Sequence, residues 1–116
     1  ALHFDSRVLF NAGSGDLARS GKALLDSLLP IFKGLPAAIA IEAHTDDRPL
    51  LFGAITSAQS LSNIRAMAVK LHLIAEGLDK AGLSAMGYGA SRGLVENNTA
   101  EQRDKNRRVT LLIESK

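Results

Sequence analysis

Charged and polar side chains follow directly on an apolar segment in the middle of the chain. Residues 37–41 read AAIAI, and residues 44–48 read HTDDR. Asp46 and Asp47 are neighbouring carboxylates, and like charges so close together repel each other. We therefore expect this position either to meet a cation or to cap a helix.

Arg65 is the candidate cation, because it lies in the helix predicted to follow this segment. At 3.6 residues per turn it falls roughly 90° from the centre of that helix's apolar stripe, so we expect it to border the core. A carboxylate and a guanidinium on two rigid elements suit a ligand that carries both an ammonium and a carboxylate. Asp46 would meet the ammonium, and Arg65 would hold the carboxylate as a fork. The simpler alternative is that Asp46 and Arg65 pair with each other or with solvent.

The composition predicts one folded domain over residues 1–116, with 46% apolar and 22% charged residues. The net charge of +2 is too balanced to indicate a nucleic-acid-binding protein, and the absence of cysteine excludes disulfides and thiolate metal sites. No stretch approaches the ~18 consecutive apolar residues of a membrane span. The chain does not begin with methionine, and we interpret it as a domain excised from a longer membrane-anchored protein.

The elements that must position these residues alternate along the chain. A strand is predicted first, and helices and strands then follow in turn, which is typical of helices packed on a sheet. The second helix carries an apolar stripe at spacings of 3 and 4, expected to face the core: Leu61, Ile64, Ala68, Leu71, Ala75 and Leu78. The predicted order is a strand over 2–10, a helix over 17–33, a strand over 37–43, a helix capped by Ser57, a strand over 83–88, a short helix opened by Thr99 and a strand over 109–113.

Five stretches in order resemble the C-terminal peptidoglycan-binding domain of OmpA-like proteins. IEAHTDDRP (41–49) and LSNIRAMAV (61–69) match the family's His-Thr-Asp strand end and its Leu-Ser-x-x-Arg-Ala-x-x-Val helix. VLFNAGSGDLARSGKALLD (8–26), SAMGYGASRG (84–93) and NNTAEQRDKNRRV (97–109) match its first strand, turn and helix, its Gly-rich loop and its closing segment. The resemblance covers nearly the whole chain. It implies an α+β fold of β/α/β/α/β/α/β order, a two-layer sandwich in which helices pack on one face of a mixed sheet.

The resemblance also implies a function and a binding site. In this family the matching residues, Asp46 and Arg65, bind the diaminopimelate of the peptidoglycan stem peptide, whose free end is a zwitterion. We expect Thr45, Leu61 and Ser62 to shape the pocket wall. By the same resemblance, Arg107 is a further candidate near the ligand.

The motif HTDDRP, followed by a long predicted loop, resembles the MotB-type stator proteins of the flagellar motor. This similarity implies the periplasmic domain of a bacterial membrane-anchored protein that forms a homodimer and joins a MotA-like partner. The main alternative is a non-flagellar anchor, such as an outer-membrane or secretion-system protein. Ala58 stands where the family has asparagine, and this departure supports a second alternative, a dimerisation module that has lost wall binding.

No motif predicts an enzyme, a cofactor or a metal site. His44 has no second His or Cys at ligand spacing, so we interpret it as structural, and His3 and His72 are isolated. There is no Gly-x-Ser-x-Gly elbow, and the basic residues near 103–108 lack neighbouring aromatic residues for stacking on bases. The alternative function from another class is an enzyme acting on peptidoglycan. Such an enzyme would release soluble fragments from cell walls.

Overall fold

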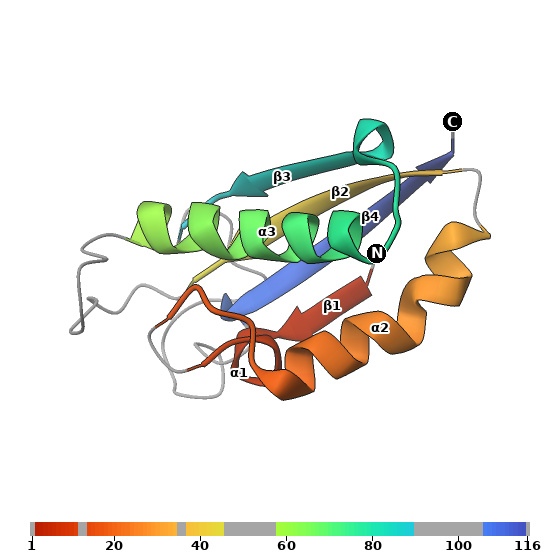
Figure 1. Cartoon of the computed structure of the whole chain (residues 1–116). Coiled ribbons are helices and arrows are strands. Elements are labelled where there is room, and N and C mark those ends of the chain that lie inside the picture. The colour runs from red at the N-terminus through yellow and green to blue at the C-terminus, as the bar shows by residue number, and fades with distance from the viewer. Residues whose placement is uncertain (1, 12–13, 35–36, 46–57, 90–105, 116) are drawn as a thin grey trace.

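A mixed four-stranded sheet forms the centre of the computed structural model, which describes residues 2–11, 14–34, 37–45, 58–89 and 106–115 (Figure 1). The strands are β1 (Leu2–Asp5), β2 (Ala37–His44), β3 (Leu83–Gly87) and β4 (Arg108–Ser115), in the order β1-β4-β2-β3. β4 pairs antiparallel with both β1 and β2, whereas β2 and β3 are parallel. The parallel pair requires a crossover, and a helix between the two strands provides it.

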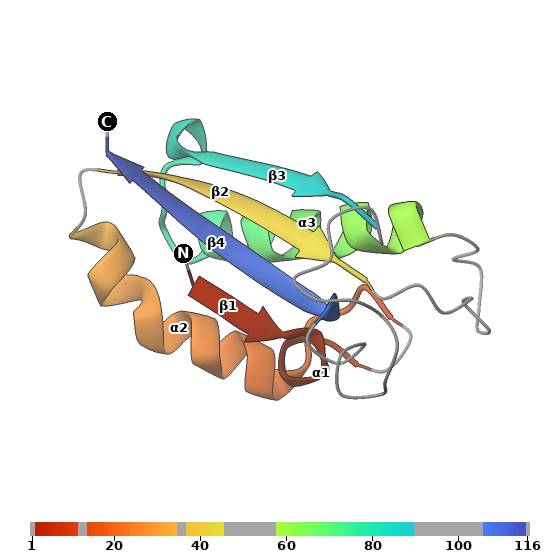
Figure 2. The same ribbon diagram turned by 180° about the vertical axis from the view of Figure 1, so that it is seen from behind.

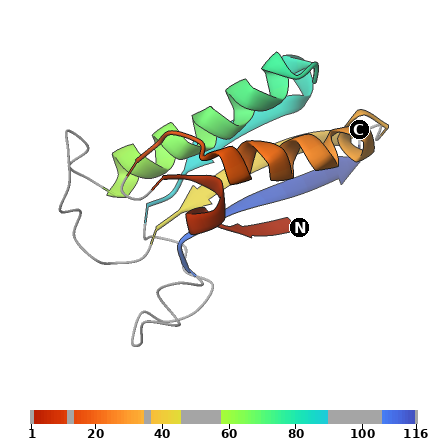
Figure 3. The same cartoon turned by 60° about the horizontal axis from the view of Figure 1, so that its bottom comes forward.

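Two long helices, α2 (Arg19–Lys33) and α3 (Ala58–Ala75), pack on the same face of this sheet (Figures 2 and 3). Two single turns complete the described elements: α1 (Ser6–Leu9) and the 3-10 helix η1 (Lys80–Gly82). The α+β fold with a mixed sheet and helices on one face is therefore confirmed. The short helix predicted at Thr99 lies outside the described residues. Within the part of the chain that is described, no helix has the length and hydropathy of a membrane span.

The hydrophobic core lies between the helices and the sheet. Alternate side chains of β2 and β4 point into it, as the period of two along a strand requires. α2 and α3 cover it with residues one helical turn apart. Its buried members are Leu9, Phe10, Leu25, Leu29, Phe32, Ile39, Ile41, Ala43, Ala66, Val69, Leu73, Leu83, Val109 and Leu111.

The strand predicted over residues 2–10 is wrong in its second half. β1 ends at Asp5, and Ser6–Leu9 form the single turn α1. Asp5 caps this turn, because its side chain accepts a hydrogen bond from the backbone N–H of Arg7 at 2.8 Å. The turn buries Leu9 completely and leaves Val8 44% exposed. The apolar run at residues 8–10 has the composition of a strand. The helical turn depends on the Asp5 cap, which lies before the run and is not visible in its apolar pattern.

Replacing Asp5 by alanine should lower the free energy of unfolding by about 1 kcal/mol near neutral pH, the usual effect of losing a helix cap. Burial raises the pKa of Asp5, but hydrogen bonds from the Arg7 side chain and backbone outweigh it, and the pKa lies below its ordinary value. The carboxylate's contribution is therefore present above the unfolded-state pKa of about 3.9 and is lost as pH falls through the folded-state value. Urea unfolding of the wild type and Asp5→Ala at about pH 7 and about pH 3 measures this difference. An equal loss at both pH values would show that the charge contributes nothing.

The face of α3 that meets the sheet also differs from the predicted one. Of the predicted stripe, Leu61 is buried, but Ile64 is 45% and Leu71 58% exposed. Val69 and Leu73 face the core instead and are fully buried. Both sets recur at helical spacing, so periodicity alone does not distinguish them. The observed rotation of α3 also carries Arg65 inward rather than to the border of the core.

Candidate functional site

The ends of several elements meet at one edge of the sheet. The register pairs His44, the last residue of β2, with Arg108, the first residue of β4, and Asp5 at the end of β1 pairs with the same residue. The parallel pairing of Ala43 with Gly87 brings the end of β3 to this edge as well. The beginning of α3 lies beside it in Figure 1. Parallel strands place their carboxyl ends at one edge, where ligands of α/β proteins commonly bind.

A chain of hydrogen bonds ties this edge to α3. The backbone N–H of Thr45 donates to the carbonyl oxygen of Gly89 at 2.8 Å, and the N–H of Gly89 donates to Oγ of Ser62 at 2.9 Å. The Ser62 hydroxyl in turn donates to the carbonyl oxygen of Gln59 at 3.0 Å. Thr45 and Ser62 are both buried, so these bonds are shielded from water. The end of β2 and the first turns of α3 are thereby held in a defined position.

A second contact brings α3 close to β3. The N–H of Gly87 donates to Oδ1 of Asn63 at 3.0 Å. A Cβ at Gly87 would clash with the backbone N of Asn63 and would lie 2.5 Å from the carbonyl carbon of Ser62. Only glycine permits this approach of helix and strand without a shift of the backbone.

Arg65 is buried to 7% exposure, one turn along α3 from Ser62. Its Nε donates to the carbonyl oxygen of Ser14 at 2.9 Å, and its guanidinium carbon lies 5.0 Å from the centre of the Phe10 ring. Burial lowers the pKa of Arg65 from its ordinary value. The side chain is therefore held by the turn that precedes α2 and by an aromatic face.

The guanidinium of Arg65 has no carboxylate partner among the described residues, where the ion pairs involve Arg7, His44 and His72. Within the same residues its two terminal nitrogens donate no hydrogen bond, since only Nε is bonded. Removing a charge from water without a counter-charge is costly. The arrangement therefore suits an anionic group that two parallel N–H donors can grip.

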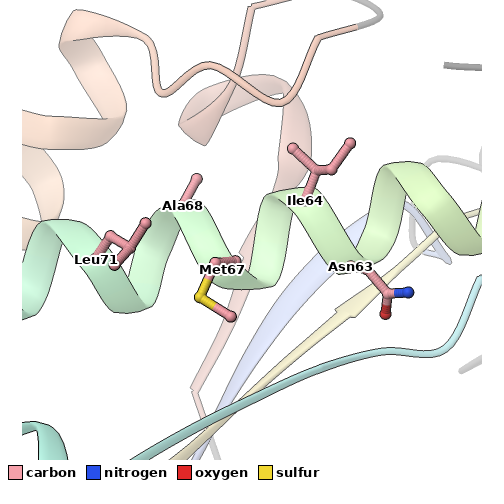
Figure 4. A pocket seen from close by; sticks show the side chains of 5 residues that line it. All are labelled: Asn63, Ile64, Met67, Ala68 and Leu71. Carbon is pink, nitrogen blue, oxygen red and sulfur yellow. The ribbon is translucent and has the colours of Figure 1, made fainter.

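An open apolar groove of about 370 Å³ lies along α3 on the side turned away from the core (Figure 4). The residues that line it are Asn63, Ile64, Met67, Ala68 and Leu71. It contains no charged side chain, so it does not suit a zwitterion. The chemistry predicted from the sequence points to Arg65 and not to this groove.

Comparison with known proteins supports the resemblance read from the motifs. A profile of the OmpA family matches residues 9–107, which is most of the chain. The chain belongs to the OmpA family.

Several relatives of this OmpA-family chain carry motility or wall-associated names. Motility protein B of Bacillus subtilis is 36% identical over 110 residues, covering 91% of the chain and 41% of the relative. The peptidoglycan-associated lipoprotein of Pseudomonas aeruginosa is 30% identical over 111 residues, covering 96% of the chain and 64% of the relative. The crystal structure of a MotB-like protein from Desulfovibrio vulgaris has a TM-score of 0.94 at 28% identity, covering 98% of the chain and 72% of that protein. The chain spans less than half the length of the Bacillus relative.

The structure places most of the predicted site residues of this OmpA-family domain at the same edge. Leu61, Ser62 and Arg65 share the first turns of α3, and Thr45 is linked to Ser62 through Gly89. Leu61 is 3% exposed. Asp46 lies outside the described residues, although it follows Thr45 directly. The ligand-binding role of all these residues stays a prediction.

Arg107 immediately precedes β4, and its carbonyl oxygen accepts a hydrogen bond from the N–H of Ser6 at 3.0 Å. Because Arg108 pairs with His44, this backbone connection lies at the edge where β2 ends. The side chain of Arg107 is half-buried. Its contribution to ligand binding stays a prediction.

His44 packs within the fold of the OmpA-family domain. Its ring is buried and stacks on Tyr88, with ring centroids 5.3 Å apart and an interplanar angle of 14°. Nε2 of His44 also lies 3.9 Å from a carboxylate oxygen of Glu42. These contacts support a structural interpretation of His44.

Sequence reasoning missed the two groups that hold Arg65, the carbonyl oxygen of Ser14 and the ring of Phe10. Ser14 lies 51 residues before Arg65 in the sequence. A backbone carbonyl carries no residue-type signal, and Phe10 resembled an ordinary core residue. Only the tertiary packing of Ser14 and Phe10 against α3 brings these groups together.

Proposed function

We propose that this OmpA-family domain binds peptidoglycan without covalent chemistry and anchors a longer membrane protein to the cell wall. The observation that carries the proposal is the buried guanidinium of Arg65, which lacks a carboxylate partner among the described residues. The ligand group is the zwitterionic end of diaminopimelate in the stem peptide. Arg65 takes its carboxylate, and Asp46 takes its ammonium.

The remaining predicted site residues determine the shape of the site. Ser62 and Thr45 are fixed by buried hydrogen bonds, so the first turns of α3 present Arg65 in one orientation. Leu61, next to Ser62 in α3, is 3% exposed and supplies an apolar side chain to the pocket wall. A preorganised site of this kind loses little conformational entropy when the ligand binds.

The membrane protein that we propose is a MotB-like stator subunit located in the periplasm. The HTDDRP motif and the similarity to motility protein B and to a MotB-like crystal structure support this choice. A homodimer and a MotA-like partner follow from the same proposal. Two domains that engage one polymer bind more firmly than either alone, so each site needs only modest affinity.

A non-flagellar wall anchor is the second candidate, and the similarity to a peptidoglycan-associated lipoprotein favours it. The two candidates share the binding site and differ in the protein that carries it. Deleting the gene and scoring swimming motility distinguishes them, because a stator subunit is needed for rotation and a lipoprotein anchor is not.

Replacing Asp46 by asparagine should reduce binding to purified sacculi that contain diaminopimelate by at least ~30-fold, because the ammonium loses its counter-charge at a cost of roughly 2–5 kcal/mol. The matched control is Asp47→Asn, which makes the same change in net charge one residue away and should bind like the wild type. Co-sedimentation over a range of sacculi concentrations gives both affinities. Equal binding by the wild type and Asp46→Asn would overturn zwitterion capture while leaving wall binding intact.

The same sacculi test the two remaining rivals. An enzyme would release soluble muropeptides during the incubation, whereas we expect none. A dimerisation module that has lost wall binding would stay in the supernatant as the wild type and would sediment as a dimer in analytical ultracentrifugation. Retention of the wild type without fragment release would contradict both rivals.

A further inference from the structure

Asp26, His72 and Glu76 form a cluster of potential metal ligands at the contact between α2 and α3. One ligand atom from each side chain lies within 4.8 Å of the others. Nε2 of His72 lies 2.7 Å from Oδ1 of Asp26, which is hydrogen-bonding distance. The His72 side chain is only 12% exposed, whereas that of Asp26 is 45% exposed. The cluster therefore sits at the surface with one largely buried nitrogen donor.

The fold itself sets this arrangement. Glu76 directly follows α3, and its N–H donates to the carbonyl oxygen of His72 at 3.0 Å, so the two side chains lie one turn apart on the same side. Leu73 is fully buried against the core and fixes the rotation of α3 at this point. Leu25 is 1% exposed and does the same for α2 beside Asp26. α2, α3 and the residue directly after α3 thus bring three donor atoms to one point.

We propose that Asp26, His72 and Glu76 bind a zinc ion that links α2 to α3. An imidazole nitrogen with two carboxylate oxygens is a donor set that zinc accepts, and water would fill a fourth tetrahedral position. Calcium and magnesium prefer oxygen ligands alone and in larger number, so the imidazole disfavours them. This site shares no residue with the proposed peptidoglycan site, and Arg65 lies two turns away along α3.

The geometry requires only a small adjustment. Metal–ligand distances of about 2.0–2.1 Å in a tetrahedral site place neighbouring ligand atoms about 3.3 Å apart. Nε2 of His72 and Oδ1 of Asp26, now 2.7 Å apart, need to separate slightly as the metal replaces the shared proton. Side-chain rotations of Asp26 and Glu76 achieve this without moving either helix, since both side chains are exposed.

The test uses the chain without a histidine tag, freed of metal by chelation. Isothermal titration with zinc chloride should give one site per chain, and zinc should raise the thermal unfolding temperature. Asp26→Asn, His72→Gln and Glu76→Gln should each weaken binding by at least ~10-fold. The controls are His3→Gln and Glu114→Gln, a histidine and an acid elsewhere on the surface, which should bind zinc like the wild type.

Glu76→Gln is the decisive variant, because Glu76 is exposed and lies outside the His72–Asp26 hydrogen bond. Its metal-free unfolding temperature should equal that of the wild type, so a loss of zinc binding cannot be attributed to misfolding. Cobalt substitution supplies a second readout, as a four-coordinate site gives intense visible absorption that the three variants should lack. The proposal is overturned if the wild type shows no saturable zinc binding, or if Glu76→Gln and His72→Gln bind zinc as tightly as the wild type.

Discussion

Replacing Arg65 by methionine is expected to reduce retention on sacculi by at least ~30-fold, because the ligand carboxylate loses a buried cationic partner at a cost of roughly 2–5 kcal/mol. Methionine keeps an unbranched apolar stem, so contact with the Phe10 ring is largely retained. Stability should stay the same or rise, because a buried charge without a counter-charge is removed. Affinity for sacculi is therefore expected to fall while the free energy of unfolding does not. Co-sedimentation with sacculi and thermal unfolding, both on the same preparation, measure the two effects.

A lysine at this position separates charge from geometry. Arg65→Lys keeps the positive charge but loses the fork and the hydrogen bond from Nε to the Ser14 carbonyl. We expect its affinity to lie between those of the wild type and Arg65→Met. Arg19→Met is the matched control, since Arg19 is exposed at the start of α2, and it should bind like the wild type. Wild-type affinity in Arg65→Met would contradict the proposed site.

Replacing Gly87 by alanine is expected to impair both folding and wall binding. The added Cβ would lie 2.5 Å from the carbonyl carbon of Ser62, and a backbone atom cannot give way as a flexible side chain does. Forcing α3 away from β3 should lower the free energy of unfolding by about 1–3 kcal/mol. The same displacement shifts Ser62, and with it Arg65 one turn further along the helix. We therefore expect affinity for sacculi to fall even at temperatures where the variant is fully folded.

Gly34→Ala is the control for this prediction, because a Cβ at Gly34 would meet the carbonyl oxygen of Pro30 at 3.5 Å, an ordinary contact. Its φ of −84° is also accessible to alanine. Urea unfolding and co-sedimentation of both variants should show losses for Gly87→Ala alone. Unchanged stability in Gly87→Ala would mean that α3 and β3 tolerate a wider separation than the structure indicates.

The zinc and wall-binding proposals can fail separately. Of the proposed metal ligands only His72 lies on α3 with Arg65, and the two sites share no residue. A zinc-free variant such as Glu76→Gln should therefore keep its affinity for sacculi. Arg65→Met should likewise keep its affinity for zinc.

Local patterns in the sequence were sufficient to predict most of the elements. The buried strand before His44 is short, apolar and bounded by a proline and by charge, and it forms β2 as expected. Gly34 ends α2 where a glycine is expected after a helix. Family motifs predict the site at the end of this strand and on the next helix. These features depend on neighbouring residues, which is why they can be read without a structure.

Tertiary packing decided what local patterns left open. The sequence offers two apolar stripes on α3, and the face through Val69 and Leu73 turns inward, with Gly87 letting the helix approach β3. Arg65 is buried for the same reason. β4, last in the chain, lies between β1 and β2 because strand pairing joins residues far apart in sequence. The meeting of Asp26 with His72, 46 residues away, likewise exists only after both helices dock on the sheet.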